Sequence, residues 1–310
     1  MQWFLDATTT GHKFALMVVA ILLFAVVMGA ILFAVDRPKR VPTWVVAAGF
    51  LGPTIVLLLV GLVYPALETI RGSFHNRDGS TFVGLDNYVT VFTEDNFQTV
   101  LLNTLLWVLL VPLVTTGLGV VYAYLVDRTR FEALAKALVF LPMAISMVGA
   151  GVIWKFVYEY RPDQPGVHQI GLLNQLLGLV GIDPQQFLLN QPANNLYLIL
   201  VMIWIQAGFA MTVLSAAIKA IPDDIVEAAR LDGVSGLQMF RYVTVPSIRP
   251  ALVVVLTTVA ITTLKVFDVV RTMTGGQFGI GATLAVLLFV LVIPIIAYNV
   301  RQLRLAEEIR

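Results

Sequence analysis

Cysteine is absent from this chain of 310 residues, and charged residues are scarce. Without cysteine the chain can form no disulfide, no thiolate metal site and no cysteine nucleophile. Only 13% of the residues are charged, whereas a soluble domain carries about a quarter. Together with a mean hydropathy of +0.87, this shortage excludes a water-soluble enzyme.

A concentration of positive charge is also lacking. The formal net charge is +1, and the 20 Lys and Arg residues are scattered along the chain. Because binding a phosphate backbone requires a concentrated basic surface, we do not expect nucleic acid as a partner. The partners expected are membrane lipid, other proteins or a small solute.

Long apolar runs occupy much of the sequence. A helix needs about 20 apolar residues to cross a bilayer, and the sequence contains a series of runs of about that length. These runs are 14–35, 43–65, 99–125, 137–158, 196–220, 250–270 and 281–300. The sequence therefore predicts an all-α polytopic membrane protein, a helical bundle of about seven spans.

The first run is predicted to be a retained membrane helix. Charged residues follow it directly at Asp36 and Arg37, as a stop-transfer signal and not as the small-residue cleavage site of a signal peptide. We expect one domain at 1–42, made of this helix and a basic cytoplasmic linker, and a second domain at 43–310 that holds the other spans.

Positive charge is distributed unequally between the two sides of the predicted bundle. Thirteen of the 20 Lys and Arg residues fall on one side, six on the other, and Lys265 lies within a span. Because cytoplasmic loops are enriched in these residues, the richer side is expected to be cytoplasmic, with the N-terminus outside and the C-terminus inside. The polar, turn-rich segments 66–98 and 159–195 then become outer loops that could dock an extracytoplasmic partner.

The cytoplasmic segment 221–249 predicts a short, sharply bounded helix. Pro222 suits the first turn of a helix, Asp223 and Asp224 favour its positive end, and Gly233 suits a left-handed stop. A second amphipathic stretch leads back to the membrane. Such helices could insert into a groove of a cytoplasmic partner, although an ordinary solvated loop is the simpler alternative.

The same segment carries a recurring pattern of residues. Glu227-Ala228-Ala229 is followed four residues later by Gly233, with Asp232 before it, and then by Val243-Thr244-Val245-Pro246. This string resembles the cytoplasmic signature of the permease subunits of ABC importers. Its position between two spans favours that interpretation over a chance tripeptide.

Other motifs extend the resemblance over roughly 45–310, toward the maltose-type carbohydrate permeases. Within them it favours the larger permease subunit and the alpha-glucoside-type members. The motifs are Gly84-Leu85-Asp86-Asn87-Tyr88, Asn103-Thr104, Phe140-Leu141-Pro142 with Trp154, Gly171-Leu172-Leu173-Asn174, and Phe267-Asp268 with Thr274-Gly275-Gly276. The segment after Gly276 departs from the family pattern, because the usual outer segment before the last span is shorter here.

The resemblance implies a type I ABC importer permease fold and half of a translocation path for a sugar, such as an oligosaccharide or an alpha-glucoside like maltose or trehalose. It also implies a second permease subunit, two copies of a cytoplasmic ATPase and an extracytoplasmic sugar-binding protein, in a bacterial or archaeal cytoplasmic membrane. The ATPase-coupling residues implied are Glu227, Ala228, Ala229, Asp232, Gly233, Phe240 and Pro246.

ATP hydrolysis is expected in the partner and not in this chain. The sequence contains no Gly-x-x-x-x-Gly-Lys-Ser/Thr phosphate loop. We therefore expect no cofactor, no metal and no enzymatic activity in this subunit, with ATP and Mg²⁺ bound by the ATPase.

Candidate residues of the solute path lie within the spans. Lys265 and Asp268 share one face of the sixth span, where exposure to lipid would cost about 2.5–3.5 kcal/mol. They form either an ion pair that fixes helix packing or a polar wall of the path. Trp154, Trp204 and Gln206 offer the aromatic and polar groups that a sugar needs, but packing or anchoring at the membrane interface also accounts for tryptophan.

Other classes of membrane protein fit the sequence less well. An ion-coupled secondary transporter would show repeated halves and several buried acids. No clear repeat is present, and Asp268 is the lone acidic residue within the predicted spans. A permease of the same superfamily for a non-sugar solute is a second alternative. An intramembrane enzyme is disfavoured because His12, His75 and His168 lie outside the spans, and a seven-span receptor gives no reason for the Glu227 pattern.

Overall fold

The computed structural model describes residues 10–36, 42–76, 78–127, 129–162, 164, 168–274 and 278–308. Within them the regular structure is helical, apart from one isolated bridge between His75 and Phe82. The predicted all-α fold is confirmed. The chain forms two compact units, Met1–Arg71 and Gly72–Arg310. The domain boundary expected after residue 42 stays a prediction.

The first unit consists of two apolar helical segments. Its elements are α2 (Thr10–Asp36), α3 (Thr43–Leu58), the π-helix η1 (Leu59–Val63) and α4 (Tyr64–Gly72). The last three follow one another without a break, and α2 contacts α3. Their apolar side chains are largely exposed, as expected of helices whose solvent is lipid.

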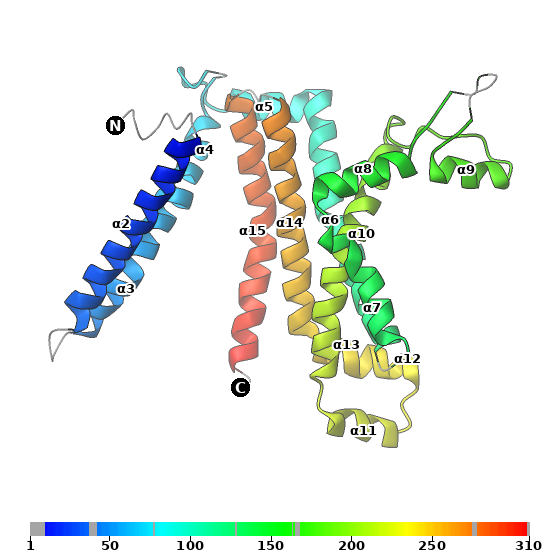
Figure 1. Cartoon of the computed structure of the whole chain (residues 1–310). Coiled ribbons are helices and arrows are strands. Elements are labelled where there is room, and N and C mark those ends of the chain that lie inside the picture. The colour runs from blue at the N-terminus through cyan, green and yellow to red at the C-terminus, as the bar shows by residue number, and fades with distance from the viewer. Residues whose placement is uncertain are drawn as a thin grey trace. The chain divides into compact units, whose positions relative to one another are not determined.

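The second unit is built around four long helices (Figure 1). They are α6 (Asp95–Val126), α10 (Ala193–Lys219), α14 (Arg249–Thr274) and α15 (Phe278–Glu308). α6 packs along α10, α14 packs against both, and α15 packs against α14. The core between them is aliphatic, with Val111, Met211, Leu214, Val255 and Val259 buried.

α6 and α10 run in the same direction, and three contacts set their register. Near one end, the indole nitrogen of Trp107 donates to Oδ1 of Asn195 over 3.3 Å. Midway, a Cβ added to Gly119 would lie 2.7 Å from that of Ala210, so glycine permits the close approach. Near the other end, Ser215 donates to Asp127.

The predicted span 137–158 is bent and is not one straight helix. It contains α7 (Glu132–Phe140), the 3₁₀-helix η2 (Leu141–Ala144) and α8 (Met147–Val157), and the two arms meet at 103°. Pro142 lacks the N–H that would continue α7, and the Ser146 hydroxyl starts a new helix by accepting from the Gly149 amide.

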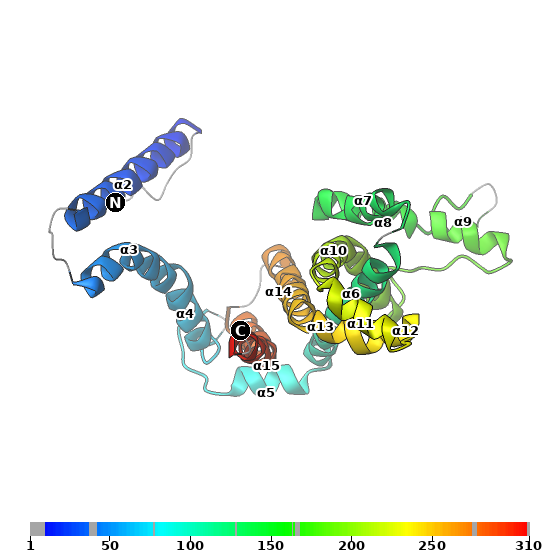
Figure 2. The same ribbon diagram turned by 90° about the horizontal axis from the view of Figure 1, so that it is seen from below.

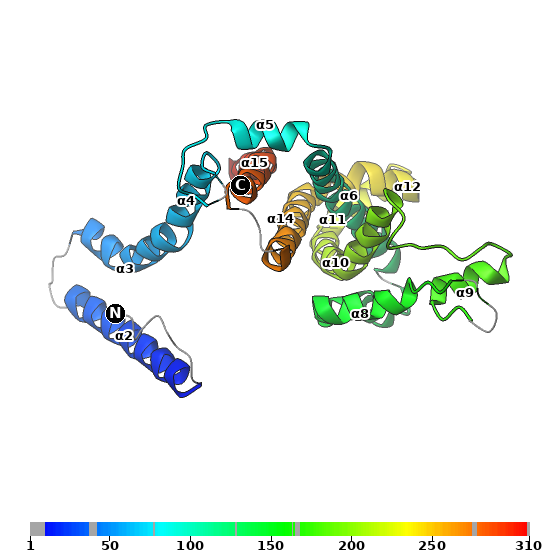
Figure 3. The ribbon, with the colours of Figure 1, turned by 90° about the horizontal axis from the view of Figure 1, so that it is seen from above.

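Short helices close both ends of the second unit. α5 (Asp86–Thr93) contacts α6 and α15 at one end, and α9 (Leu172–Leu179) extends outward from the same end (Figure 1). Seen from that end, α5 and α9 lie at different edges of the unit (Figure 3). At the other end, which we name the loop end, a helical segment contains α11 (Asp223–Leu231), α12 (Gly236–Gln238), the π-helix η3 (Met239–Thr244) and α13 (Val245–Ser247). These elements lie across the end of α6 and α10 (Figure 2).

Four helices of the described residues are long and apolar enough to cross a membrane, or up to six if each bent pair is one span. The four are Ala47–Gly72, Asp95–Val126, Ala193–Lys219 and Ile280–Tyr298. The bent pairs are Glu132–Ala144 with Met147–Val157, and Gly236–Ser247 with Arg249–Leu264. The first predicted span, 14–35, lies within α2, one helix of 27 residues.

Candidate functional site

The helix predicted after Pro222 is confirmed as α11, and its two ends form as local chemistry dictates. Asp223 and Asp224 lie in its first turn, near the positive end of the helix. At its end Gly233 has φ +76°, and the Val234 amide donates to the Ala229 carbonyl over 3.2 Å. This is the hydrogen-bonding pattern of a Schellman stop, which requires a left-handed residue.

The segment α12, η3 and α13, which we name the return segment, is fixed to the bundle by α6. Ser235 and Gln238 cap α12 reciprocally, and the Tyr124 hydroxyl donates to the Gly236 carbonyl over 2.9 Å. The Tyr124 and Phe240 rings lie 4.8 Å apart. Beside them is an apolar pocket of about 320 Å³, lined by α6 and by Leu237 and Phe240. Tyr124 is therefore one attachment of the loop to the bundle, beside Phe240, which packs against the buried core.

The predicted coupling residues fall into two groups. Glu227, Ala228, Asp232 and Gly233 are exposed on α11 and its end, and Ala229 is half-buried. Leu231, which the prediction omitted, is 89% exposed among them.

The other two predicted residues belong to the return segment. Phe240 is half-buried against Tyr124, and Pro246 is exposed in the first turn of α13. No ion pair reaches Glu227 from the part of the chain that the structure describes. The exposed face of α11 thus offers a carboxylate, small residues and one leucine to a partner.

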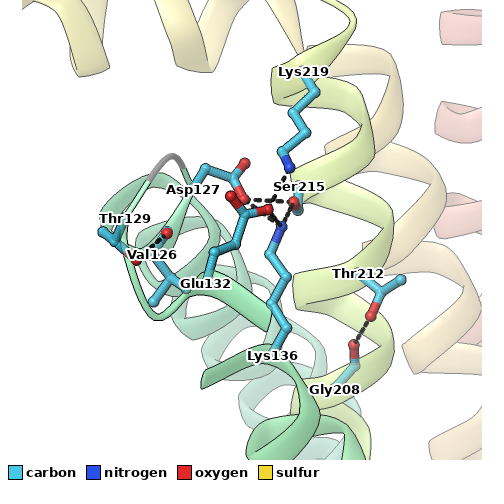
Figure 4. Close-up of polar contacts among 9 residues, drawn as sticks. All are labelled: Val126, Asp127, Thr129, Glu132, Lys136, Gly208, Thr212, Ser215 and Lys219. Atoms are coloured by element: carbon cyan, nitrogen blue, oxygen red, sulfur yellow. Dashed lines mark hydrogen bonds and ion pairs between the residues drawn. The ribbon is translucent and has the colours of Figure 1, made fainter. Parts of the chain in front are cut away.

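A charged cluster lies where α6, α7 and α10 meet at the loop end (Figure 4). Lys136 Nζ lies 2.5 Å from Asp127 Oδ1 and 2.7 Å from Glu132 Oε1. It also donates to the Ser215 hydroxyl, which in turn donates to Asp127 over 2.7 Å. Lys219 pairs with Glu132 from the other side. We name these five residues the inner clamp.

Burial gives the inner clamp its electrostatic strength. The Asp127 side chain is 5% exposed and that of Lys136 is 22% exposed. Water screens such a pair much less than it screens a surface pair, and separating the charges would leave a carboxylate uncompensated. Oδ2 of Asp127 has no hydrogen-bond partner among the described residues, so its charge is balanced through Oδ1.

Two of the candidate path residues lie together. The Trp154 and Trp204 rings meet edge to face at 5.6 Å, and Tyr158 packs on Trp154 at 5.0 Å. Both tryptophans line a largely apolar pocket of about 550 Å³ between α6, α7, α8 and α10. The Trp154 indole nitrogen is buried without a hydrogen-bond partner among the described residues.

The remaining path candidates do not join this cluster. Gln206 is buried and is absent from the lining of the tryptophan pocket, which takes Ile203, Trp204 and Ala207 from the same helix. Lys265 and Asp268 have their backbone in α14, but their side chains lie outside those that the structure describes. Their pairing stays a prediction.

The motif Gly84-Leu85-Asp86-Asn87-Tyr88, in the first predicted outer loop, organises the turn that follows residue 72. The Asn87 side chain donates to the Ser73 and His75 carbonyls over 2.9 and 2.7 Å. Tyr88 shares a hydrogen bond with the Ser73 hydroxyl, and Gly84 has φ +59°. These residues of the motif are therefore architectural.

The motif Gly171-Leu172-Leu173-Asn174, in the second predicted outer loop, holds the segment 159–195 together in the same way. The Asn174 amide donates to the Glu159 and Gln185 carbonyls and accepts from the Gln185 amide over 2.8 Å. A Cβ at Gly171 would collide with the Glu159 carbonyl. One buried asparagine thus joins three parts of this segment.

The inner clamp and Tyr124 were not predicted from the sequence. The spacing of Glu132 and Lys136, four residues apart on a helix, is a signal for half of the clamp. The contributions of Asp127 and Ser215 depend on the parallel packing of α6 and α10, which no local pattern reveals. Within the described residues no cluster of three or more His, Asp or Glu side chains is placed to hold a metal.

The chain resembles known permeases in sequence. Residues 115–303, more than half of the chain, match the family model described as binding-protein-dependent transport system inner membrane component. The osmoprotective compounds uptake permease protein of Synechocystis sp. is 44% identical, over 84% of this chain and 100% of that protein. The alpha-glucoside transport system permease protein of Rhizobium meliloti is 43% identical, over 82% of this chain and 81% of that protein.

The fold also resembles solved transporters. A crystal structure of a bacterial ABC transporter involved in the import of the acidic polysaccharide alginate matches with a TM-score of 0.65 and 26% identity, over 83% of this chain and 96% of that one. The family match covers the inner clamp, α11 and the bundle α10, α14 and α15. The chain therefore belongs to the binding-protein-dependent transport system inner membrane components, the permease subunits of ABC importers.

Proposed function

We propose that this chain is the larger permease subunit of a type I importer for an alpha-glucoside, and that residues 221–249 couple ATP hydrolysis in a partner to alternating access. The observation that carries the proposal is the exposed face of α11. Glu227, Ala228 and Leu231 lie open on a helix whose ends are fixed by Asp223 and Gly233. A short rigid helix with an apolar tip suits insertion into a groove of another protein.

The partners follow from that role. The importer has two copies of a cytoplasmic ATPase, which bind ATP and Mg²⁺, and one of them contacts residues 221–249 of this chain. A second permease subunit completes the path, and an extracytoplasmic binding protein delivers the sugar to the opposite end. The loop end then faces the cytoplasm, with the N-terminus outside and the C-terminus inside, as the distribution of Lys and Arg favours.

The substrate class rests on the relatives. One relative of 43% identity is named for alpha-glucoside transport, and a more distant one from Thermococcus litoralis is named for trehalose and maltose. Because a relative of 44% identity is named for osmoprotective compounds, a small osmoprotective solute is the second candidate. The paired rings of Trp154 and Trp204 offer the apolar surface on which a sugar ring packs.

Uptake by whole cells tests the substrate. The chain is expressed with its second permease, ATPase and binding protein in cells that lack their own alpha-glucoside transport, and uptake of labelled trehalose and maltose is measured. We expect saturable, ATP-dependent uptake of an alpha-glucoside that unlabelled alpha-glucosides inhibit and beta-glucosides do not. Uptake of a non-sugar osmoprotectant alone would contradict the alpha-glucoside assignment.

A further inference from the structure

The inner clamp has no part in the function proposed so far, yet it lies beside the coupling loop. Asp127 immediately follows α6, Glu132 and Lys136 lie in the first turns of α7, and Ser215 and Lys219 lie in the last turns of α10. Since the loop begins at residue 221, a displacement of the loop reaches the clamp before it reaches the rest of the bundle.

One side chain connects all three helices. Lys136 of α7 bonds at once to Asp127 after α6 and to Ser215 of α10, and Lys219 of α10 holds Glu132 of α7. Each charged side chain of the inner clamp forms an ion pair with an opposite charge, and the Asp127 side chain is buried. Opening the clamp in each transport cycle would strand the Asp127 carboxylate in a site with little water.

The same three helices are also locked farther along their length. A Cβ at Gly208 of α10 would lie 2.7 Å from the Val139 carbonyl oxygen of α7 and 2.9 Å from Phe140 Cα. Gly119 of α6 meets Ala210 of α10 as closely. The Tyr122 hydroxyl of α6 donates to the Ala135 carbonyl of α7 over 3.0 Å. Contacts between backbones at two levels resist both sliding and rotation.

α7 ends at the bend after η2. α8 leaves at 103° and begins with its own cap at Ser146. It is attached to α10 by contacts of its own, because Trp154 meets Trp204 and the Tyr158 hydroxyl donates to the Tyr197 carbonyl over 3.0 Å.

We propose that the inner clamp stays closed throughout the transport cycle and makes α6, α7 and α10 one body, so that the coupling loop moves α7 together with α10. Asp127 and Lys136 are then positioning residues for coupling. This inference rests on the proposed coupling role of residues 221–249.

A disulfide in place of one clamp contact tests this. The Ser215 hydroxyl donates to Asp127 Oδ1 over 2.7 Å, so a cysteine pair at these positions places two thiols beside each other. The pair closes if the two Cβ atoms come within about 3.5–4.5 Å, and closure is measured by titrating free thiols after oxidation. Because the chain contains no cysteine, D127C/S215C introduces the only thiol pair in it. The complete transporter, with cysteine-free partners, is reconstituted in proteoliposomes, and ATP hydrolysis and sugar import are measured before and after oxidation.

We expect the reduced pair to import at least about fivefold less sugar per ATP than the unmodified transporter, because the clamp is weakened. Oxidation should restore this ratio to within about twofold, because the disulfide replaces the lost contact. The single variants D127C and S215C should not respond to oxidation. Arrest of import on oxidation, reversed by a reductant, would overturn the proposal, since it would show that the contact must open.

A second pair of variants covers the case in which the cysteine pair does not assemble. Lys136→Arg keeps the charge and should keep the coupling ratio, whereas Lys136→Met with Asp127→Asn removes both buried charges together and should lower it. Equal coupling in both would overturn the clamp.

Stimulation of ATP hydrolysis by the binding protein, purified with its bound ligand, gives a readout that does not require the sugar to be identified. If the unmodified transporter imports no alpha-glucoside, the substrate assignment fails. The role of the inner clamp is then tested by comparing this stimulation of ATP hydrolysis between the variants and the unmodified transporter.

Discussion

Gly208 is one of the residues whose lack of a side chain sets the distance between helices. Its position faces the backbone of α7 at Val139 and Phe140, so any Cβ must displace that helix and not merely a flexible side chain. Gly117, on α6, has no atom within 4 Å of the place where a Cβ would stand. The two glycines therefore separate the effect of close packing from that of helix propensity.

We expect Gly208→Ala to destabilise the permease by about 1–3 kcal/mol, because α7 must shift away from α10. Gly117→Ala should be neutral or stabilising by about 0.5–1 kcal/mol, because alanine favours the helix more than glycine does. Thermal unfolding of the purified transporter compares them. A midpoint for Gly208→Ala equal to or above that of Gly117→Ala would contradict the close packing of α7 on α10.

Single polar residues in the outer segments serve the architecture and not the solute. Asn174 satisfies backbone groups of Glu159 and Gln185, and it is 1% exposed. Its neighbour Gln175 makes a hydrogen bond to the Gln169 carbonyl at the surface. Both residues bond to backbone, but only one of them is buried.

Asn174→Leu should therefore loosen the segment 159–195, because each buried backbone group left unpaired costs about 1–3 kcal/mol. Limited proteolysis of the reconstituted transporter should cut this segment faster, whereas Gln175→Leu should leave the cutting rate nearly unchanged. Equal rates for the two variants would show that Asn174 does not hold the segment together.

At the scale of elements, α11 contacts the return segment at η3, and α12 and η3 are held to α6 through Tyr124. Two residues earlier, Tyr122 makes the equivalent bond from α6 to α7. One helix thus holds the loop segment with one tyrosine and the clamp helix with another.

Tyr124→Phe removes the bond to Gly236 and keeps the ring contact with Phe240. We expect a loss of about 0.5–1.5 kcal/mol in local stability, with faster hydrogen exchange in residues 235–247 only. Tyr122→Phe should raise exchange in residues 132–140 instead. If both variants changed the same segment, the two attachments would not be independent.

The elements that the sequence predicted well are those defined by local chemistry. The start and stop of α11 depend on Pro222, Asp223 and Gly233 acting within a few residues, so the sequence alone predicts both ends of this helix. The angle of 103° at residue 145 could not be predicted, because hydropathy is uniformly high through 137–158 and a proline in a membrane helix does not by itself break it. The inner clamp was missed because its members come together only when α6 and α10 pack side by side.

At the scale of the whole molecule, the shortage of charge and the position of the charges both matter. Composition excluded soluble classes, and the motifs over 45–310 predicted the family that the comparisons show. Composition could not predict the path, because Trp154, Trp204 and Gln206 were chosen by residue type, and only the first two lie together. The path also requires a second permease, which this sequence does not contain.

The central claim is that residues 221–249 transmit ATP hydrolysis in a partner to transport. Glu227 is exposed on α11 outside any ion pair formed by the described residues, so reversing its charge should act on a partner and not on the fold. Asp224 lies on the same face of α11 as Glu227, so the control is Arg304, which is exposed on α15 outside residues 221–249. Reversing its charge should change stability by no more than about 0.5 kcal/mol and leave coupling in place.

The most direct test is the number of sugar molecules imported per ATP by the complete transporter in proteoliposomes, measured for Glu227→Lys and Arg304→Glu. We predict that Glu227→Lys hydrolyses ATP but imports sugar at least about tenfold less efficiently per ATP, whereas Arg304→Glu keeps the unmodified ratio within about twofold. An unchanged ratio in Glu227→Lys, with the ATPase still bound, would contradict the coupling role of the loop.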